Sequence, residues 1–304
     1  MITANVPCII GVGHASNSCI ILTGNKRLNR NNELIPNLPL PDVDNTRSSV
    51  GGSKNMVEQG KTILFCGDYY PNVKICVQLD NSLWKKHSSL KQNRSNASFV
   101  STKSGFYIFG GTVSPNTYEY LAKGSNQWQM GQTQIPKGFD YGCAIALKSR
   151  KEVWLFGGWD TPNRILSFDV GTHSFRELPQ LLKKWRKYGK QCAYIPGTNK
   201  IIITGGSELS GYTLNSTEII DTDNGTVTIG SPMNARRSGH GIGIISIDNR
   251  ERLVVFGGID YFNGMLDSVE LYNEDSKKWE FADIKLNEGQ CIQSFVSTKL
   301  GNII

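Results

Sequence analysis

Short apolar segments that end in a pair of glycines recur along the chain. The stretch VWLFGG at residues 153–158 places residues suited to a buried strand before two glycines, and related segments end at Gly111, Gly206 and Gly258. Weaker copies with a single glycine, ILFCGD and IILTGN, lie nearer the N-terminus. The first glycines of the six copies, spaced by 43 to 52 residues, are Gly24, Gly67, Gly110, Gly157, Gly205 and Gly257. A repeat of this period predicts copies of one supersecondary unit that bury one another's faces.

One repeat reads as four short strands. In the sixth copy, apolar or aromatic segments at 242–247, 253–256, 268–272 and 278–281 are separated by polar or glycine-rich stretches. Such segments are typical of strands joined by turns, and no segment has a sustained helical period. The repeat therefore predicts a four-stranded antiparallel meander.

A pair of apolar residues ties the third strand of a repeat to the fourth. The spacing is seven residues in four repeats and eight in a fifth, and the pairs are Tyr272 and Trp279, Phe168 and Phe175, Val77 and Trp84, Ile220 and Val227, and Tyr120 and Trp128. We expect each pair to pack one sheet against the next. The DNG turn at 223–225 has the residues that a tight hairpin with positive φ requires.

The double glycine has a structural explanation. Beside the crowded axis of a radial array, a side chain at the end of the second strand would collide with neighbouring backbone, and glycine accepts torsion angles closed to other residues. The motif is not a phosphate-binding loop, because no helix follows it and no lysine-serine or lysine-threonine pair closes it.

Together these residues resemble the kelch repeat: an apolar strand, Gly-Gly, then a Tyr-like and a Trp-like residue within a unit of about 50 residues. The resemblance implies an all-β, six-bladed kelch-type β-propeller whose four-stranded antiparallel blades surround a central channel. The spacing places the blades at about 1–50, 51–94, 95–138, 139–186, 187–234 and 235–288, with 289–304 as a closing strand.

The C-terminal segment repeats an earlier one. SFVSTK occurs at 98–103 and again at 294–299. Either the tail completes the N-terminal blade, or it begins a seventh blade that is cut short. We prefer closure, because a ring fastened by its two ends leaves no exposed sheet edge.

Composition fits one globular β domain. The 304 residues are 38% apolar and 19% charged, with 32 glycines. No apolar run is long enough for a transmembrane helix and no signal peptide is evident, so a cytoplasmic protein is expected, or a secreted one if a leader is missing from this chain. The seven cysteines include no C-x-x-C pair, and we expect small core residues. Four N-x-S/T sequons, at Asn93, Asn96, Asn215 and Asn224, matter only in a secreted chain.

A catalytic site is not predicted. Some kelch-like propellers are copper enzymes related to galactose oxidase, so an enzyme of that type is the alternative. Only four histidines are available, and His240 alone lies near the start of an inner strand, where we expect a structural, hydrogen-bonded role. DTDNG at 221–225 begins like a calcium loop, but Pro232 stands where the bidentate glutamate would be. No catalytic residue, metal or cofactor is expected.

The loops of one face predict a binding surface. In an antiparallel meander the turn between strands two and three and the crossover to the next blade emerge on the same face. Four crossovers hold 12 Lys and Arg against one acid, Asp140, in a chain with a net charge of +7. Aromatic residues interleaved with arginine are typical of binding hot spots. The predicted partner-binding residues are Tyr69, Tyr70, Trp159, Arg186, Arg236, Arg237, Tyr261 and Phe262.

These residues predict a non-catalytic protein-interaction module that binds a partner, with an acidic segment of that partner on the basic rim. Nucleic acid stacked on the rings is an alternative partner; no membrane or small-molecule substrate is indicated. The kelch resemblance implies protein binding, as a substrate adaptor of cullin-RING ligases or a cytoskeletal binder, and we expect no BTB or BACK region in this chain.

Overall fold

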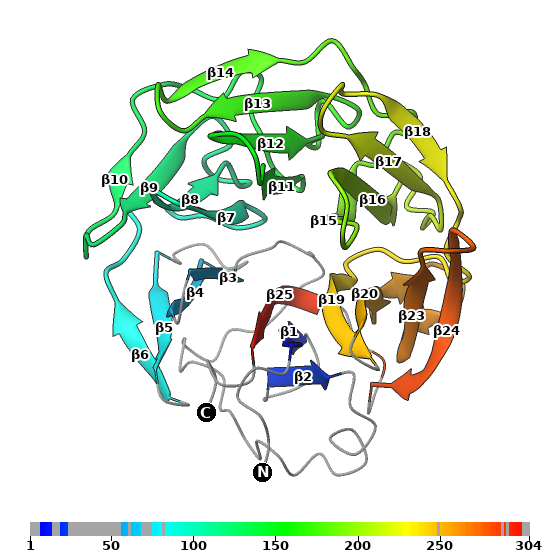
Figure 1. The fold of residues 1–304 in the computed structure, drawn as a ribbon. Coiled ribbons are helices and arrows are strands. Elements are labelled where there is room, and N and C mark those ends of the chain that lie inside the picture. The colour runs from blue at the N-terminus through cyan, green and yellow to red at the C-terminus, as the bar shows by residue number, and fades with distance from the viewer. Residues whose placement is uncertain are drawn as a thin grey trace.

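The structure is a computed structural model. It describes residues 7–13, 19–23, 56–59, 62–67, 74–80, 83–247, 250–286, 289 and 292–299. The described chain forms antiparallel sheets arranged radially around an axis, as the blades of a β-propeller (Figure 1).

Five of these sheets have four strands each, connected in sequence order. Their strands are β3(Met56–Gln59), β4(Thr62–Cys66), β5(Cys76–Asp80) and β6(Leu83–His87); β7(Ser98–Thr102), β8(Gly105–Phe109), β9(Tyr118–Ala122) and β10(Gln129–Met130); β11(Cys143–Ala146), β12(Glu152–Phe156), β13(Ile165–Asp169) and β14(Ser174–Glu177); β15(Tyr188–Tyr194), β16(Lys200–Ser207), β17(Thr217–Asp221) and β18(Val227–Gly230); and β19(Gly241–Ile247), β20(Arg250–Phe256), β23(Ser268–Asn273) and β24(Lys278–Lys285). A hairpin of β21(Ile259–Asp260) and β22(Gly264–Met265) interrupts the last blade. The first strand of each blade lies nearest the axis and the fourth lies outermost (Figure 1).

The two ends of the chain share a further sheet of three strands. β1(Pro7–Gly13) lies between β2(Cys19–Thr23) and β25(Ile292–Lys299). β25 runs antiparallel to β1, with Pro7 opposite Lys299 and Gly13 opposite Ile292. This sheet contacts β19 on one side and β3 on the other. The described residues thus form five four-stranded blades rather than six, because only three strands are described where the termini meet.

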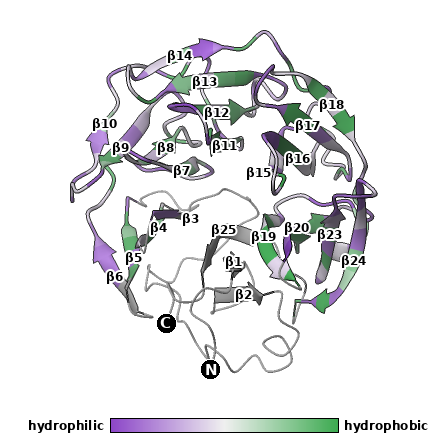
Figure 2. Ribbon diagram, viewed as in Figure 1, coloured by the Kyte–Doolittle hydropathy of each residue, from purple (hydrophilic) through white to green (hydrophobic). Residues whose placement is uncertain are grey.

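The hydrophobic core lies between neighbouring blades. Phe109 of β8 packs edge-on against Phe168 of β13, with ring centroids 5.1 Å apart, and both are fully buried. In the next gap, Trp154 and Phe156 of β12 share a cluster with Ile201 of β16. The outer strands β6, β10 and β14 are largely hydrophilic (Figure 2). Apolar residues are concentrated on the inner and middle strands because these are covered on both faces.

Three of the predicted apolar pairs face each other across strands. Tyr272 lies opposite Trp279, and Phe168 lies opposite Phe175. Ile220 opposite Val227 is the third pair. In the other two repeats the register differs.

Trp84 lies opposite Leu79 rather than Val77, because the hairpin between β5 and β6 is tighter. Tyr120 lies opposite Gln129. Trp128, beside Gln129, instead packs on Phe99, with ring centroids 5.7 Å apart.

In several motifs the first glycine leaves no space for a side chain. A Cβ at Gly110, where φ is +65°, would collide with the carbonyl oxygen of Phe139 in the crossover to the next blade. Gly205, at φ +55°, is blocked in the same way by the carbonyl oxygen of Arg237. At Gly158 the nearest atom to a Cβ would be Thr161 Oγ1, at 3.6 Å. A Cβ at the second glycines Gly111, Gly206 and Gly258 would also lie 3.0 Å or less from a backbone oxygen, so the predicted crowding is absent only at Gly158 among these positions.

Four of the cysteines form disulfides, which the sequence pattern did not predict. Cys66 and Cys76 face each other on β4 and β5 and are bonded within one blade. Cys143 of β11 is bonded to Cys192 of β15, which joins two adjacent blades. All four are buried, so they are core residues as expected, but they are cross-linked. No helix in the described ranges is long and apolar enough to span a bilayer.

Candidate functional site

The exposed large apolar side chains of the described residues gather in the loops of one face. Nine of the eleven lie between the second and third strands of a blade or in the crossover to the next blade, and these nine are Val113, Trp159, Leu181, Trp185, Leu209, Tyr212, Tyr261, Phe262 and Met265. Ile229 and Phe281 lie on outer strands. Apolar patches of this kind mark interaction sites on soluble proteins.

Three aromatic rings and an arginine form a compact group in this face. Tyr212 comes from the turn between β16 and β17, and its ring centroid is 4.9 Å from that of Tyr261 and 5.8 Å from that of Phe262. The guanidinium carbon of Arg236 lies 5.7 Å from the centre of the Phe262 ring. We call these four residues the aromatic-arginine cluster; all four side chains are exposed.

Backbone and side-chain hydrogen bonds fix the loops that carry the cluster. Thr213 Oγ1 accepts a hydrogen bond from the Tyr261 amide at 3.0 Å, which joins the loops of two blades. The Asp260 carboxylate accepts from the Phe262 amide at 2.9 Å and from Asn263 Nδ2 at 3.0 Å. The rings of Tyr261 and Phe262 are therefore presented on a preorganised hairpin, which lowers the entropy lost when a partner binds.

A second aromatic group adjoins the first. The Trp159 ring stacks on the Tyr188 ring with centroids 5.8 Å apart, and Tyr141 lies 5.7 Å from Trp159. Lys187 Nζ lies 5.1 Å from the centre of the Trp159 ring. A Cβ on Gly211 would be 3.9 Å from both Tyr188 and Tyr261, so Gly211 separates the two groups.

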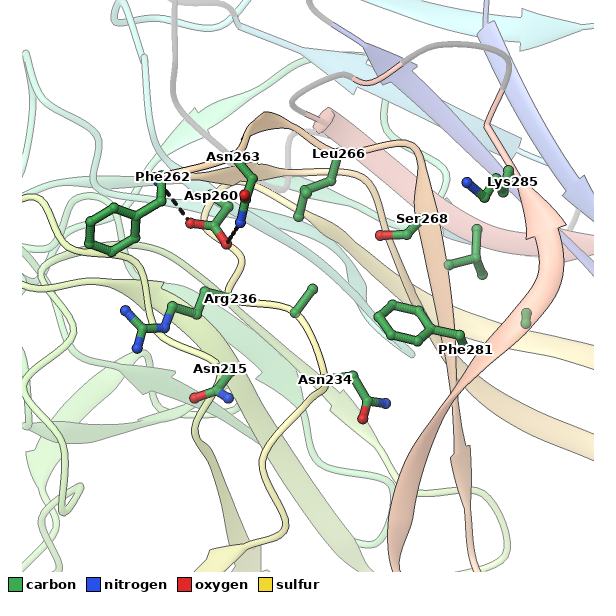
Figure 3. A pocket seen from close by; sticks show the side chains of 13 residues that line it. Asn215, Asn234, Arg236, Asp260, Phe262, Asn263, Leu266, Ser268, Phe281 and Lys285 are labelled. Carbon is green, nitrogen blue, oxygen red and sulfur yellow. Dashed lines mark hydrogen bonds between the residues drawn. The ribbon is translucent and has the colours of Figure 1, made fainter.

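A pocket of about 720 Å³ opens beside the aromatic-arginine cluster (Figure 3). Arg236 and Phe262 lie on one side of it and Phe281 lies on the other (Figure 3). Leu266 and Val269 contribute apolar lining, and the remaining lining residues are Asn215, Asn234, Ala235, Asp260, Asn263, Ser268, Ala282 and Lys285. Its volume lies in the range of pockets that hold small ligands.

Two predicted binding residues lie in the interior instead of on the rim. Arg237 is fully buried, and its guanidinium lies 3.0 Å from the Glu270 carboxylate. It also donates to the carbonyl oxygens of Gly257 and Ser268, at 2.8 and 2.9 Å. Arg186 is buried in the same way against Glu218. Burial and these ion pairs remove both arginines from the surface available to a partner.

The same arrangement occurs in a third blade. Arg94, in the crossover before β7, pairs with Glu119 at 3.1 Å and donates to the Gly110 carbonyl oxygen. In each case the arginine fastens a crossover to the glycine motif of the following blade. A glutamate near the start of the third strand of the following blade marks such a buried arginine in the sequence. Counting the charges of the crossovers alone does not reveal it.

His240 has the structural role that was expected. It is fully buried, and its Nε2 lies 2.8 Å from Thr204 Oγ1. Burial lowers the pKa of the imidazole to about 3, so the ring is neutral near pH 7. Within the described ranges, no three His, Cys, Asp or Glu side chains are grouped so that they could hold a metal ion.

Sequence reasoning missed a buried lysine. Lys190 of β15 is fully buried, and its Nζ donates to the carbonyl oxygens of Arg186 and Tyr141, at 2.8 and 3.2 Å. Burial, with the nearby charge of Arg186, lowers the pKa of Lys190 to about 7. Burial also raises the pKa of the neighbouring Asp140 carboxyl, which accepts from the Trp159 amide at 3.2 Å.

The remaining predicted residues divide into two sets. Trp159, Arg236, Tyr261 and Phe262 lie in the loops of one face and belong to the two aromatic groups just described. Tyr69 and Tyr70 lie outside the described residues. Tyr212, Tyr188 and Tyr141 were missed, because single tyrosines in loops carry no local pattern.

Comparisons with known proteins agree with the fold. No family model matches the chain. A kelch repeat-containing protein of Dictyostelium discoideum is 21% identical over 198 residues, which cover 58% of this chain and 29% of that protein. The chain therefore spans less than a third of that relative's length. The solved structure of YjhT superposes with a TM-score of 0.63 at 15% identity, covering 78% of this chain and 85% of that one. The radial sheets and the superposition on YjhT show that the chain has a β-propeller fold, and its repeat motifs are similar to the repeats for which the Dictyostelium protein is named.

Proposed function

We propose that this chain is a non-catalytic protein-interaction module that binds a partner through the loop face of the propeller. The observation that carries the proposal is the aromatic-arginine cluster, in which three exposed rings and an exposed guanidinium come together from the loops of two blades. Trp, Tyr and Arg dominate the binding energy of protein interfaces because they bury large areas and keep a polar group. The matched Dictyostelium protein is named for the same repeat.

The partner presents an acidic segment in this proposal. Arg236 and Lys187 both lie over aromatic rings in these loops, and the chain carries a net charge of +7. Arginine can hold a carboxylate with two parallel hydrogen bonds. The partner-binding set becomes Trp159, Tyr212, Arg236, Tyr261 and Phe262.

The architecture that we propose for the whole chain is one propeller with six blades. The three-stranded sheet of β1, β2 and β25 would be the sixth blade, with β25 as its closing strand. Its contacts with β19 and β3 support this assignment, since they place it between the last and the first four-stranded blade. The two disulfides favour an oxidising compartment over the cytoplasm, because thiols in the cytosol are kept reduced.

Partner capture with matched variants tests the proposed function. The wild-type chain, Phe262→Asp and Ile229→Asp would each be used as bait in an extract of the source cells. Phe262 and Ile229 are exposed to similar degrees, 64% and 70%, but only Phe262 belongs to the cluster. We expect a set of proteins held by the wild type and Ile229→Asp and lost by Phe262→Asp.

Calorimetry with a captured partner measures how much each residue contributes to the binding free energy. Replacing Trp159 or Arg236 with alanine should each cost about 2 kcal/mol of binding free energy. Binding should also weaken with added salt, since exposed charges are screened. A partner that binds all of these variants equally would contradict the proposal.

A further inference from the structure

We propose that the pocket beside the aromatic-arginine cluster receives a large apolar side chain of the partner that lies within two residues of an acidic residue. This inference rests on the proposed function, because it specifies which segment of a protein partner the site reads. It assigns the acidic residue to Arg236 and the apolar side chain to the space in front of Phe281.

The apolar half of the pocket is formed by the last blade. Phe281 lies on the outer strand β24 and is 58% exposed, although burial of an aromatic ring stabilises a protein or a complex. Leu266, Val269 and Ala282 line the pocket with it. An apolar side chain of the partner would cover the Phe281 ring and recover this free energy.

The charged half of the pocket is a single arginine without a partner. Among the described residues, no ion pair or hydrogen bond to the Arg236 guanidinium is found, and its contact is with the Phe262 ring. Of the acids that line or border the pocket, Asp260 is occupied by the Phe262 amide and Asn263. Asp267 lies 3.4 Å from Lys285 at the other end. The Arg236 guanidinium can therefore donate hydrogen bonds to a carboxylate of the partner.

The positions of Arg236 and Phe281 limit how far apart the acidic and the apolar residue can be in the partner's segment. Figure 3 shows Arg236 and Phe281 on opposite sides of one pocket, so the carboxylate and the apolar group must come from nearby residues. Successive residues of an extended chain rise by roughly 3.3 Å and point to alternate sides. A carboxylate and a large apolar side chain one or two residues apart in an extended segment can therefore reach both.

Selection from a random peptide library tests the motif. The baits are the wild type, Phe281→Asp, and Ile229→Asp as the matched control, since Ile229 is an exposed apolar residue on the outer strand of the neighbouring blade. We expect the wild type and the control to enrich peptides with Asp or Glu within two residues of Leu, Ile, Met or Phe. Phe281→Asp should lose the apolar preference.

An enriched peptide then tests the role of Arg236 by a double-mutant cycle. Changing the peptide's acidic residue to the corresponding amide should weaken binding about tenfold to the wild type and much less to Arg236→Gln. An equal loss on both proteins would overturn the pairing. So would a library with no enriched motif, or one in which Phe281→Asp enriches the same peptides as the wild type.

The outcomes separate this inference from the proposed function. If captured partners depend on Phe262 but the peptide selection shows no acidic-apolar pair, the interaction surface stands and the pocket assignment fails. If capture is also unaffected by Phe262→Asp, the proposed function fails as well.

Discussion

Arg236 and Arg237 are neighbours in the chain but lie in opposite environments. The Arg237 guanidinium is buried 3.0 Å from the Glu270 carboxylate, whereas that of Arg236 is exposed above the Phe262 ring. One arginine therefore holds the fold together, and the other is available to a partner. The contrast predicts opposite consequences for the two substitutions.

Arg237→Ala should lower the free energy of unfolding by about 3 to 5 kcal/mol, because it leaves the Glu270 charge buried without its partner. Arg236→Ala should change it by no more than about 0.5 kcal/mol. Urea denaturation followed by tryptophan fluorescence measures both. Glu270 also accepts from the Asn234 and Ala235 amides, so Arg237→Ala/Glu270→Gln removes the buried charge and keeps an acceptor oxygen. Part of the loss should be recovered in this double variant; one as unstable as Arg237→Ala would refute the charge explanation.

Stability should rise with pH through the titration of Lys190. The folded-state pKa, about 7, lies below the usual 10.5, so between these values the unfolded chain binds the proton more strongly. Unfolding then takes up a proton, and the free energy of unfolding increases as pH rises from 7 to 10.5, by on the order of a few kcal/mol. Well below pH 7 the lysine is charged in both states, so Lys190 adds no dependence of the unfolding free energy on pH there.

Lys190→Met isolates that contribution. Urea midpoints of the two proteins measured at intervals from pH 6 to pH 10 should diverge in slope, with the variant flatter. Parallel profiles would show that Lys190 titrates normally in the folded protein.

The glycine motif can be tested with two glycines that both have positive φ. Gly110 is at +65° and Gly124 at +81°, so an alanine at either site has the same kind of backbone strain, about 1 to 2 kcal/mol. Only at Gly110 would the new Cβ meet the Phe139 carbonyl oxygen, whereas nothing lies within 4 Å at Gly124. Gly110→Ala should therefore be the more destabilising by at least about 2 kcal/mol in thermal or urea unfolding. Equal losses would mean that strain alone, and not close approach of the next blade, selects glycine.

The two disulfides should contribute unequally. Cys143–Cys192 spans 49 residues and joins two blades, and Cys66–Cys76 spans 10 residues within one hairpin. The loop-entropy model gives about 4 kcal/mol for the first and about 3 kcal/mol for the second. Replacing each pair by alanines and comparing unfolding free energies under oxidising conditions checks the order. A larger loss from the Cys66 and Cys76 pair would exclude chain entropy as the main term.

The repeat pattern by itself determined the class of fold. Glycine motifs 43 to 52 residues apart and four short strands per copy are local features, and the structure has these strands in radial, antiparallel sheets. Three of the five apolar pairs pack with residues of the preceding blade, as predicted, and their members also face each other across a hairpin. Where a hairpin was tighter, as before Trp84, the register could not be read from spacing alone.

Only the tertiary structure decided which loop residues can meet a partner. Arg236 and Arg237 are the same residue type and adjacent in sequence, but the first side chain is exposed and the second is fully buried. Their environments depend on Glu270 and Phe262, which lie about 25 to 35 residues further along the chain. The disulfides, the burial of Lys190 and the pocket in front of Phe281 likewise arise from contacts between distant segments. A local pattern determines strands and turns, whereas contacts between blades determine which of their side chains remain at the surface.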